Sequence, residues 1–568
     1  MRYGFRMTRI IRTWLAFFLC SCLVSLGAGE PVRSQKGMVV CQNRIAANIG
    51  AKVLEDGGSA VDAAVATAFA LAVVHPIAGN IGGGGFLVAR DGNGKAMCYD
   101  FREMAPEGAS PRMFLKDGRY SDTLHHESYL SVGVPGTVAG LHIAWKERGK
   151  LSWKRLVEPA IRLAEEGFPV SETLSASLKK FLPEFKEHPA TITAFTKDGT
   201  PYEAGEMLRQ PDLAKSLRRI SAHGPTGFYR GETARLLVAE MKRGGGLIKA
   251  SDLRAYRAKQ REPVQGSYRD FDIIAMPPPS SGGIALIEML NMLEGYDLRA
   301  MGSGSPQAAH LMAESMRRGY RDRALYLGDP DFNSAIPVTQ LTSKTYAAEM
   351  RKGISMDHST PLSLAGFEDP HESDQTTHIS VVDSARNAVA LTYTLEDNYG
   401  SKILVAGAGL LLNNEMGDFN AGPGLTDGKG LIGTVPNLAR PQKRPLSSMS
   451  PTILAKDGKL FMVTGSPGGR TIINTVLETI LNVVDFGMDA QAAVDAPRFH
   501  HQWLPDSIQL EPNTAYPKGF SEALKTRGHA LSMRGGRQGA AQVIVVSKDG
   551  LEGGADSKRW PESAAVAY

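Results

Sequence analysis

Cysteine is scarce in this chain of 568 residues, which contains only four. Cys20 and Cys22 lie in an N-terminal stretch that we interpret as a leader, so Cys41 and Cys98 remain for the rest of the chain. Two cysteines form at most one disulfide, which excludes a disulfide-stapled scaffold. With 42% hydrophobic residues, we expect a large buried core, as one globular unit or two closely packed ones.

Long hydrophobic runs are missing after the first thirty residues. Residues 1–29 have the pattern of a secretory signal, and the apolar run is short for a bilayer span. A lipoprotein signal with lipidation at Cys22 is a less favoured alternative, because the apolar run continues past that residue. We therefore expect a periplasmic or secreted protein. The signal consists of a basic head with Arg2, Arg6, Arg9 and Arg12, the run Trp14 to Leu26, and Gly27-Ala28-Gly29.

The sequence also lacks a strong charge and the motifs of common cofactor sites. The formal charge of +5 falls to +1 without the four arginines of the leader, so nothing indicates a nucleic-acid partner. His500-His501 has no accompanying set with metal-ligand spacing, and we expect a structural role and no metal or cofactor. Gly82 to Gly85 lacks the Lys-Ser/Thr of a phosphate loop, so we interpret it as a tight packing turn.

The remaining pattern is mixed helix and strand without repeats. Ser59 to Val74 reads as a capped, buried helix that Pro76 ends, and residues 151–347 alternate helical stretches with loops. From about residue 370 the pattern changes to β-hairpins, with turns at 384–387, 456–459 and 548–550. Residues 420–443 form a long loop of the kind that is often a lid. We expect sheets covered by helical layers.

A threonine pair opens the first hairpin, in Gln375-Thr376-Thr377-His378. Such a pair is usually only the start of a strand, since β-branched residues favour strands. A threonine hydroxyl becomes a nucleophile when a base lies beside it, and that base can be its own α-amine. This amine exists only if the chain is cut, so the functional hypothesis is cleavage of the Gln375-Thr376 bond.

Other candidate groups lie in the same half of the chain. The returning strand of the hairpin brings Thr394 beside Thr376. Gly465-Ser466-Pro467-Gly468-Gly469 precedes a helix, where unpaired N–H groups suit an oxyanion hole, although a glycine turn is often only structural. A zwitterionic ligand could be bound by charged and hydroxyl groups, with acids on the ammonium and arginine and serines on the carboxylate. These groups are Glu396, Glu415, Asp418, Arg102, Ser447 and Ser448.

Several motifs resemble the γ-glutamyltranspeptidases, a family of N-terminal-nucleophile hydrolases that includes glutathione hydrolases. The resemblance covers essentially the whole chain after the leader. It is carried by Gln375 to His378, Asn413-Asn414-Glu415-Met416-Gly417-Asp418-Phe419, Arg444 to Thr452 and Gly465 to Gly469, with further matches at Gly82 to Phe86, Asp100 to Glu103, Pro277 to Gly283 and Arg498 to Gln502.

The resemblance implies an α+β fold, a four-layer αββα sandwich formed jointly by a large subunit, residues 30–375, and a small catalytic subunit, residues 376–568. Thr376 would be the nucleophile, for self-cleavage and for attack on a γ-glutamyl amide such as glutathione, with release to water or to an amino acid or dipeptide acceptor. Thr394 would orient it, and Gly468 and Gly469 would hold the oxyanion. The substrate carboxylate would be bound by Arg102, Ser447 and Ser448, and its ammonium by Glu396, Glu415 and Asp418.

Two departures from the family pattern affect these expectations. Glu396 stands where asparagine is familiar, and Lys429 stands in the lid where an aromatic residue can sit. We therefore expect hydrolysis to compete strongly with transfer. The alternatives are a glutaryl acylase of the cephalosporin acylase type, a relative acting on poly-γ-glutamate, and an unprocessed binding protein. A glutaryl group has no ammonium, so it would leave the three acids of the pocket without a partner. Burying unpaired carboxylates costs free energy, which disfavours a glutaryl donor.

Overall fold

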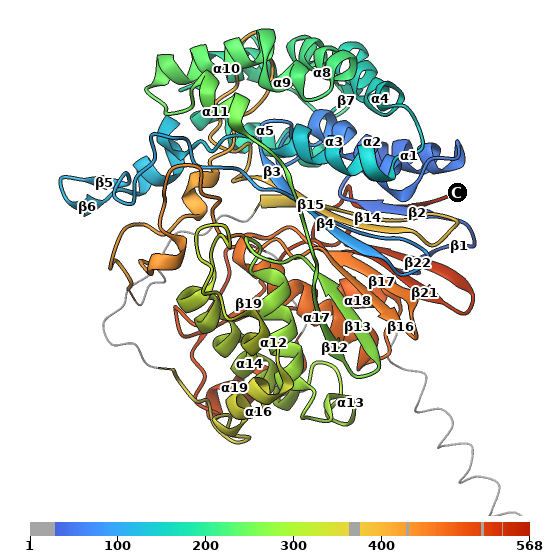
Figure 1. The fold of residues 1–568 in the computed structure, drawn as a ribbon. Coiled ribbons are helices and arrows are strands. Elements are labelled where there is room, and N and C mark those ends of the chain that lie inside the picture. Colours follow the sequence, from blue (N-terminus) through green and yellow to red (C-terminus); the bar gives the residue numbers. More distant parts are fainter. Residues whose placement is uncertain (1–28, 363–374, 428–430, 513–515, 537) are drawn as a thin grey trace, which may run out of the picture.

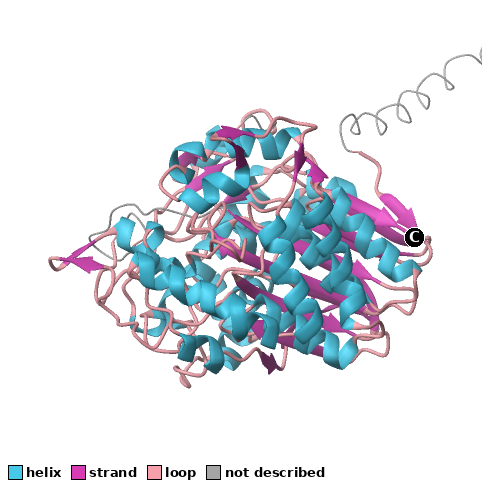
Figure 2. Ribbon diagram, turned by 90° about the horizontal axis from the view of Figure 1, so that it is seen from above, coloured by secondary structure: helices cyan, strands magenta, loops and turns pink. Residues whose placement is uncertain are grey.

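The computed structural model describes residues 29–362, 375–427, 431–512, 516–536 and 538–568. Two antiparallel seven-stranded sheets are stacked in the middle, and helices cover both outer faces (Figure 1). Seen from above, the helices lie over the strands (Figure 2). This is the expected four-layer αββα arrangement.

The first sheet contains the threonine hairpin at its centre. β14 and β15 pair with each other, and their outer neighbours are β2 and β3 from the N-terminal part of the chain. Strands from both sides of residue 375 therefore share one sheet. The order is β11 (Lys259–Arg261), β4 (Ala96–Phe101), β3 (Gly84–Arg90), β15 (Ala388–Glu396), β14 (Gln375–Val382), β2 (Met38–Cys41) and β23 (Ala564–Ala567).

The second sheet contains the other two predicted hairpins, β16 with β17 and β21 with β22. Contacts of β17 with β14 and β15, and of β21 with β14, pack it face to face on the first sheet. The order is β1 (Val32–Ser34), β22 (Gly550–Ala555), β21 (Gln542–Ser547), β17 (Lys459–Gly465), β16 (Thr452–Lys456), β13 (Phe271–Ala275) and β12 (Val264–Tyr268).

Alternation along β2 shows why both faces of the first sheet are apolar. Val39 and Cys41 belong to the core beneath the first helical layer, whereas Met38 and Val40 belong to the core between the sheets. Successive side chains of a strand point to opposite faces, so a strand covered on both sides is apolar throughout. Cys41 and Cys98 are free thiols, one in each core, and form no disulfide.

Helix α2 (Ala60–Val74) confirms the predicted buried helix. All of its residues are buried, and Ser59 and Asp62 form a capping box in which each side chain accepts from the other's backbone N–H. It packs between α1, α4 and the first sheet. The helices on this side of the sheet are α1 (Arg44–Glu55), α2, α3 (Thr137–Arg148), α4 (Trp153–Glu166), α5 (Glu172–Lys180), α8 (Pro211–His223), α9 (Thr226–Tyr229), α10 (Gly231–Gly244) and α11 (Ala250–Ala255). Of these, α8, α9 and α10 lie outermost, beyond α1, α2 and α3 (Figure 1).

The second helical layer covers the other sheet with α12 (Gly282–Leu293) and α17 (Ile472–Val484) packed against each other. The segment before α12 contains three consecutive prolines, Pro277 to Pro279, and is not helical, since a proline inside a helix removes a hydrogen bond. The helix begins directly after it, at Gly282. Further helices in this layer are α13 (Leu298–Met301), α14 (Pro306–Tyr326), α16 (Lys344–Lys352), α18 (Ala490–Asp495) and α19 (Phe520–Thr526).

The glycine run Gly82 to Gly85 was predicted as a turn, but only Gly82 and Gly83 lie outside a strand. Gly84 and Gly85 already belong to β3, where Gly84 is in register with Thr394 of β15. A Cβ at Gly83 would collide with the carbonyl oxygen of Thr394. The glycines therefore allow the backbone of this turn to approach the strand end that carries Thr394.

Candidate active site

Thr376 and Thr394 lie together at one end of the threonine hairpin. A bulge between Gln375 and Thr377 shifts the register there, and the Thr376 hydroxyl lies 3.5 Å from the Thr394 hydroxyl oxygen. Both residues line a cavity of about 430 Å³. Bulges often redirect a side chain beside an active site. Thr377, the next residue along the strand, is fully buried and does not line this cavity.

The predicted oxyanion turn reaches the same cavity. β17 ends at Gly465, and Gly468 and Gly469 have φ angles of 129° and 53°, which favour glycine over residues with a Cβ. A short 3₁₀ turn, Gly469–Thr471, then leads into α17. Gly469 lines the cavity with Thr376. Backbone N–H groups at such a turn stabilise negative charge on an oxygen.

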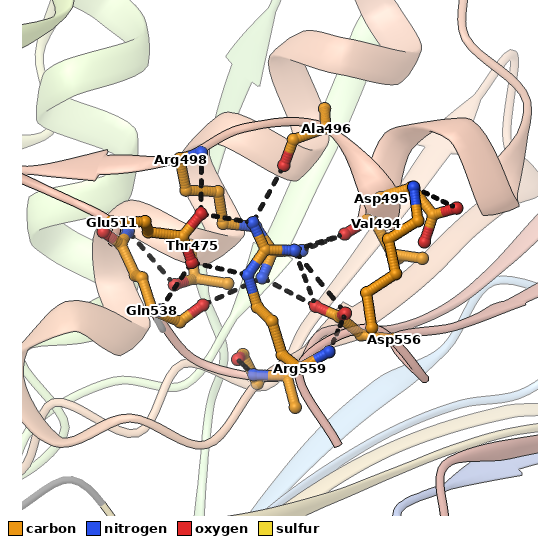
Figure 3. A network of polar contacts seen from close by, with 12 residues as sticks. Thr475, Val494, Asp495, Ala496, Arg498, Glu511, Gln538, Asp556 and Arg559 are labelled. Carbon is orange, nitrogen blue, oxygen red and sulfur yellow. Dashed lines mark hydrogen bonds and ion pairs between the residues drawn. The ribbon is translucent and has the colours of Figure 1, made fainter. Parts of the chain in front are cut away.

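A buried polar network supports this turn (Figure 3). The Ser466 hydroxyl accepts a hydrogen bond from the backbone N–H of Ala540 at 3.1 Å and donates one to the Pro467 carbonyl at 2.7 Å. Just before Ala540, the Gln538 N–H donates to Glu511 at 2.6 Å, and the Gln538 carbonyl accepts from Arg498 at 3.0 Å. The network that holds the segment after Gln538 in place consists of Arg498, Glu511, Asp556 and Arg559.

Arg102 forms ion pairs with two acids of the site, which the sequence did not reveal. It is fully buried, and its two Nη atoms bind Glu415 and Asp418, the acids assigned to the opposite end of the ligand. Burial lowers the pKa of Arg102, but the charges of Glu415, Asp418 and Glu103 outweigh burial and raise it. Arg102 is not among the described residues that line the cavity, whereas Glu415 and Asp418 are.

The two serines line the cavity beside these acids. Ser447 is held through its backbone, because its carbonyl accepts hydrogen bonds from the N–H and the hydroxyl of Ser281, both at 2.7 Å. The Ser448 hydroxyl accepts from Arg323 at 3.1 Å, and Arg323 also lines the cavity. A hydroxyl that accepts from a guanidinium keeps its own proton available for a ligand carboxylate.

Glu396 completes an acidic cluster. Its backbone has a φ of +79°, which is strained for a residue with a side chain, and its N–H donates to the Thr394 hydroxyl at 2.8 Å. Burial, and then the charges of Asp418, Asp397 and Glu415, raise the pKa of Glu396 well above the ordinary value. Burial also raises the pKa of Glu415, and that of Glu103 to about 7. Such a cluster is suited to a cationic group on a ligand.

Sequence reasoning missed one wall of the cavity. A π-helical turn, η1 (Thr123–Glu127), carries His125 and His126, and both line the cavity with Tyr120 and Asp122. His126 Nδ1 lies 3.2 Å from Glu396 Oε1. Single π turns are frequent at functional sites. The adjacent histidines were the only signal in the sequence, and no motif accompanied them.

The histidines at 500 and 501 have structural partners, as predicted. His500 bonds with Asn474 at 2.7 Å, and His501 with Asp506 at 3.0 Å. Within the described ranges, one group has the proximity to hold a metal ion: His310, Glu314 and His529. Its histidine nitrogens are hydrogen-bonded to each other at 2.7 Å, and Glu314 binds Arg317 and Arg318. These contacts fit a polar network better than a metal site.

Two predicted features lie outside the described residues. Lys429 falls in the gap 428–430, but its neighbours Asp427 and Leu431 line the cavity, which agrees with a lid. The leader falls almost entirely within residues 1–28. In the part of the chain that the structure describes, no helix is long and apolar enough to cross a membrane.

Comparison with known proteins gives one consistent answer. Residues 46–566 match the family model described as gamma-glutamyltranspeptidase. The chain is 44% identical over 557 residues to the glutathione hydrolase proenzyme of Escherichia coli K12, covering 96% of this chain and 95% of that one. It is 46% identical over 502 residues to the glutathione hydrolase proenzyme of Pseudomonas sp. strain A14, covering 88% and 87%.

Solved structures agree with this result. A cephalosporin acylase from Bacillus halodurans superposes with a TM-score of 0.83 at 27% identity, covering 96% of this chain and 98% of that chain. A γ-glutamyltranspeptidase chain from Helicobacter pylori superposes with a TM-score of 0.56 at 44% identity, covering 60% and 95%. Both the family model and the curated relatives extend over most of the chain, which therefore belongs to the γ-glutamyltranspeptidase family.

Proposed function

We propose that Thr376 is the nucleophile of γ-glutamyl hydrolysis and transfer, and that cleavage of the Gln375-Thr376 bond makes it an amino terminus. The observation that carries this proposal is the meeting of Thr376, Thr394 and Gly469 at one cavity with the acids and serines of a zwitterion site. An α-amine has an ordinary pKa of about 7.7–8.0, so near neutral pH it can accept the proton of the hydroxyl.

The reaction then follows the N-terminal-nucleophile scheme. The Thr376 oxygen attacks the γ-carbonyl carbon of the donor, and its proton passes through the α-amine to the leaving amine as the C–N bond breaks. The N–H groups of Gly468 and Gly469 stabilise the oxyanion. Water or the amino group of an acceptor then releases the γ-glutamyl group. The two subunits, residues 30–375 and 376–568, remain joined because strands from both share each sheet.

Glutathione is the donor that we assign to the site. Its γ-glutamyl end carries an ammonium for Glu396, Glu415 and Asp418, and a carboxylate for Ser447, Ser448 and Arg102. Since Arg102 binds Glu415 and Asp418 in this structure, the donor would replace those ion pairs. Its ammonium would bind the acids, while its carboxylate would bind the guanidinium. Charge balance is kept throughout this exchange, which limits the desolvation cost.

Export and release complete the proposal. The leader would direct the enzyme to the periplasm or outside the cell, with lipidation at Cys22 as the less favoured alternative. The acceptor would be an amino acid or a dipeptide, and hydrolysis would compete strongly with transfer to it. Product ratios at saturating dipeptide would contradict the last point if hydrolysis were negligible.

The decisive test is maturation of matched variants. The purified protein should give two fragments on a denaturing gel, and sequencing of the smaller one should begin at Thr376. Thr376→Ala should give one full-length band and no hydrolysis of a γ-glutamyl anilide. Thr377→Val is the matched control, because Thr377 is buried beside it and its hydroxyl has no hydrogen-bond partner in the structure. That variant should mature normally, and an uncut but active Thr376→Ala protein would overturn the proposal.

A further inference from the structure

The proposed ammonium subsite contains an imidazole beside its acids. His126 Nδ1 lies 3.2 Å from Glu396 Oε1, and the exposed fractions of the two side chains are 11% and 5%. Both side chains line the cavity that contains Thr376. An imidazolium at this position would pair with the carboxylate that otherwise receives the ammonium of the donor.

The surrounding backbone holds the pair together. A Cβ at Gly417 would collide with both His126 and Glu396, so the glycine leaves the room in which they meet. The Asn414 side chain donates to the His126 carbonyl at 3.1 Å and to Asp397 at 2.9 Å, which ties the histidine turn to the end of β15. Glu396 itself is fixed by its N–H bond to Thr394. The contact is therefore built from three separate segments.

We propose that His126 is a specificity-determining residue whose protonation decides which donor the pocket accepts. With neutral His126, the acids require a cation from the donor, and a γ-glutamyl group supplies it. With protonated His126, Glu396 already has a partner, so the donor ammonium is disfavoured and a glutaryl group, which has the carboxylate but no ammonium, is accepted. The inference rests on the proposed role of Glu396 in binding the ammonium.

Charged groups of both signs approach His126 from several segments of the chain. From its own turn, Asp122 lies 3.9 Å from Nε2, and the His125 ring lies 4.4 Å away between centroids, tilted by 49°. Glu396 at the end of β15, Asp418 in the 3₁₀ turn Glu415–Asp418 and Arg470 in the 3₁₀ turn Gly469–Thr471 line the same cavity as His126. Arg102 and Glu415 lie beyond Glu396 and are paired with each other.

The chemistry of the second activity is the same acyl transfer. The Thr376 oxygen bonds to the glutaryl carbonyl carbon, the amide C–N bond breaks, and the leaving amine takes the proton held by the Thr376 α-amine. Water then cleaves the ester and releases glutarate. Only the occupant of the ammonium subsite differs between the two donors, so the histidine affects selection and not the bonds that change.

The test is a ratio of two activities. kcat/KM is measured for γ-glutamyl-p-nitroanilide and glutaryl-p-nitroanilide between pH 5.5 and 7.5. Titration of the nucleophile amine affects both donors and cancels in the ratio. The ratio of glutaryl to γ-glutamyl activity should rise as the pH falls, by up to about tenfold per pH unit, the limit for one proton.

Three variants isolate the histidine. In His126→Asn the amide can still donate to Glu396 but cannot become charged, so the ratio should no longer depend on pH. In Asp122→Asn the loss of a nearby negative charge should lower the ratio at every pH while the slope remains. His125→Asn is the matched control and should keep the wild-type slope, since His125 Nδ1 bonds with Tyr120 at 3.0 Å and not with Glu396.

The outcomes separate the inference from the proposed function. A His126→Asn protein with the wild-type slope, or a wild-type ratio that is flat with pH, would overturn the role of His126 while leaving the γ-glutamyl activity intact. Absence of a fragment beginning at Thr376, or of any γ-glutamyl hydrolysis, would instead overturn the proposed function.

Discussion

The hydroxyl groups of Thr376 and Thr394 lie 3.5 Å apart at the open end of the same hairpin. The Thr394 oxygen also accepts the backbone N–H of Glu396 at 2.8 Å. The Thr394 hydroxyl thus contacts both the proposed nucleophile and the strained backbone of Glu396. The position of the proposed nucleophile and the shape of the proposed ammonium subsite therefore depend on one hydroxyl.

Thr394→Val should therefore impair both maturation and turnover. Valine has the same shape but leaves the Glu396 N–H without its acceptor, and an unsatisfied buried group costs about 1–3 kcal/mol. We expect a loss of roughly 10- to 100-fold in kcat, on the basis of that cost, and slower appearance of the two fragments in a gel time course. Thr394→Ser keeps the hydroxyl and should restore most of both. A fully active valine variant would contradict the positioning role.

Arg102 should contribute strongly to stability as well as to binding. Arg102→Gln leaves Glu103, Glu415 and Asp418 without their buried cation, and breaking a buried ion pair costs about 3–5 kcal/mol. The loss in stability should be smaller at acid pH, where Glu103 and Glu415, whose pKa values are raised by burial, become protonated. Urea unfolding at two pH values measures it. The control is Arg33→Gln, since Arg33 is 56% exposed and 3.7 Å from Glu552, and a surface change of this kind stays within about 0.5 kcal/mol.

Glu478 should make the fold less stable as the pH rises. Burial raises its pKa to about 8, against an ordinary value near 4.5. A carboxyl whose pKa is raised on folding contributes its stabilisation fully below pH 4.5 and loses it as the pH rises toward 8. Glu478→Gln, which resembles the protonated acid, should remove this part of the pH dependence. The unfolding midpoint of the wild type, taken relative to that of the variant, should therefore be lower at pH 8 than at pH 5. An equal difference at both values would refute it.

The two cysteines of the described chain should be chemically silent in the native protein. Both are buried, and burial raises the pKa of Cys41 to about 12 and that of Cys98 well above the ordinary value. A thiol that stays protonated is a poor nucleophile. Iodoacetamide should label neither residue until the protein is unfolded, as mass spectrometry of peptides would show, and reducing agent should leave the melting temperature unchanged. Labelling of native Cys41 would contradict the structure.

Much of the fold could be predicted from local sequence. The capped helix after Ser59, the three hairpins and the non-helical proline segment follow from patterns that neighbouring residues specify. The predictions failed at boundaries. Gly84 and Gly85 belong to a strand because β15 pairs with both of them and β4 pairs with Gly85, and a glycine pair carries no strand preference that would reveal this.

The site divides in the same way. Thr376, Thr394, Gly468 and Gly469 could be proposed from the sequence, because one hairpin joins the two threonines and a glycine turn precedes a helix. The wall that carries His126 could not, because 270 positions separate it from Glu396, and no local pattern encodes a contact of that kind. The pairing of Arg102 with Glu415 and Asp418 was hidden for the same reason.

The sequence by itself determined the family, the four-layer fold and the residues of the proposed nucleophile and oxyanion turn. Only the tertiary structure decided how the charges balance. Arg102, which we expected to bind the carboxylate of the ligand, is paired instead with Glu415 and Asp418. Glu396 faces His126. Charges from distant segments interact through space in a buried, weakly polarisable cavity, where the pKa of each group depends on all of its neighbours at once.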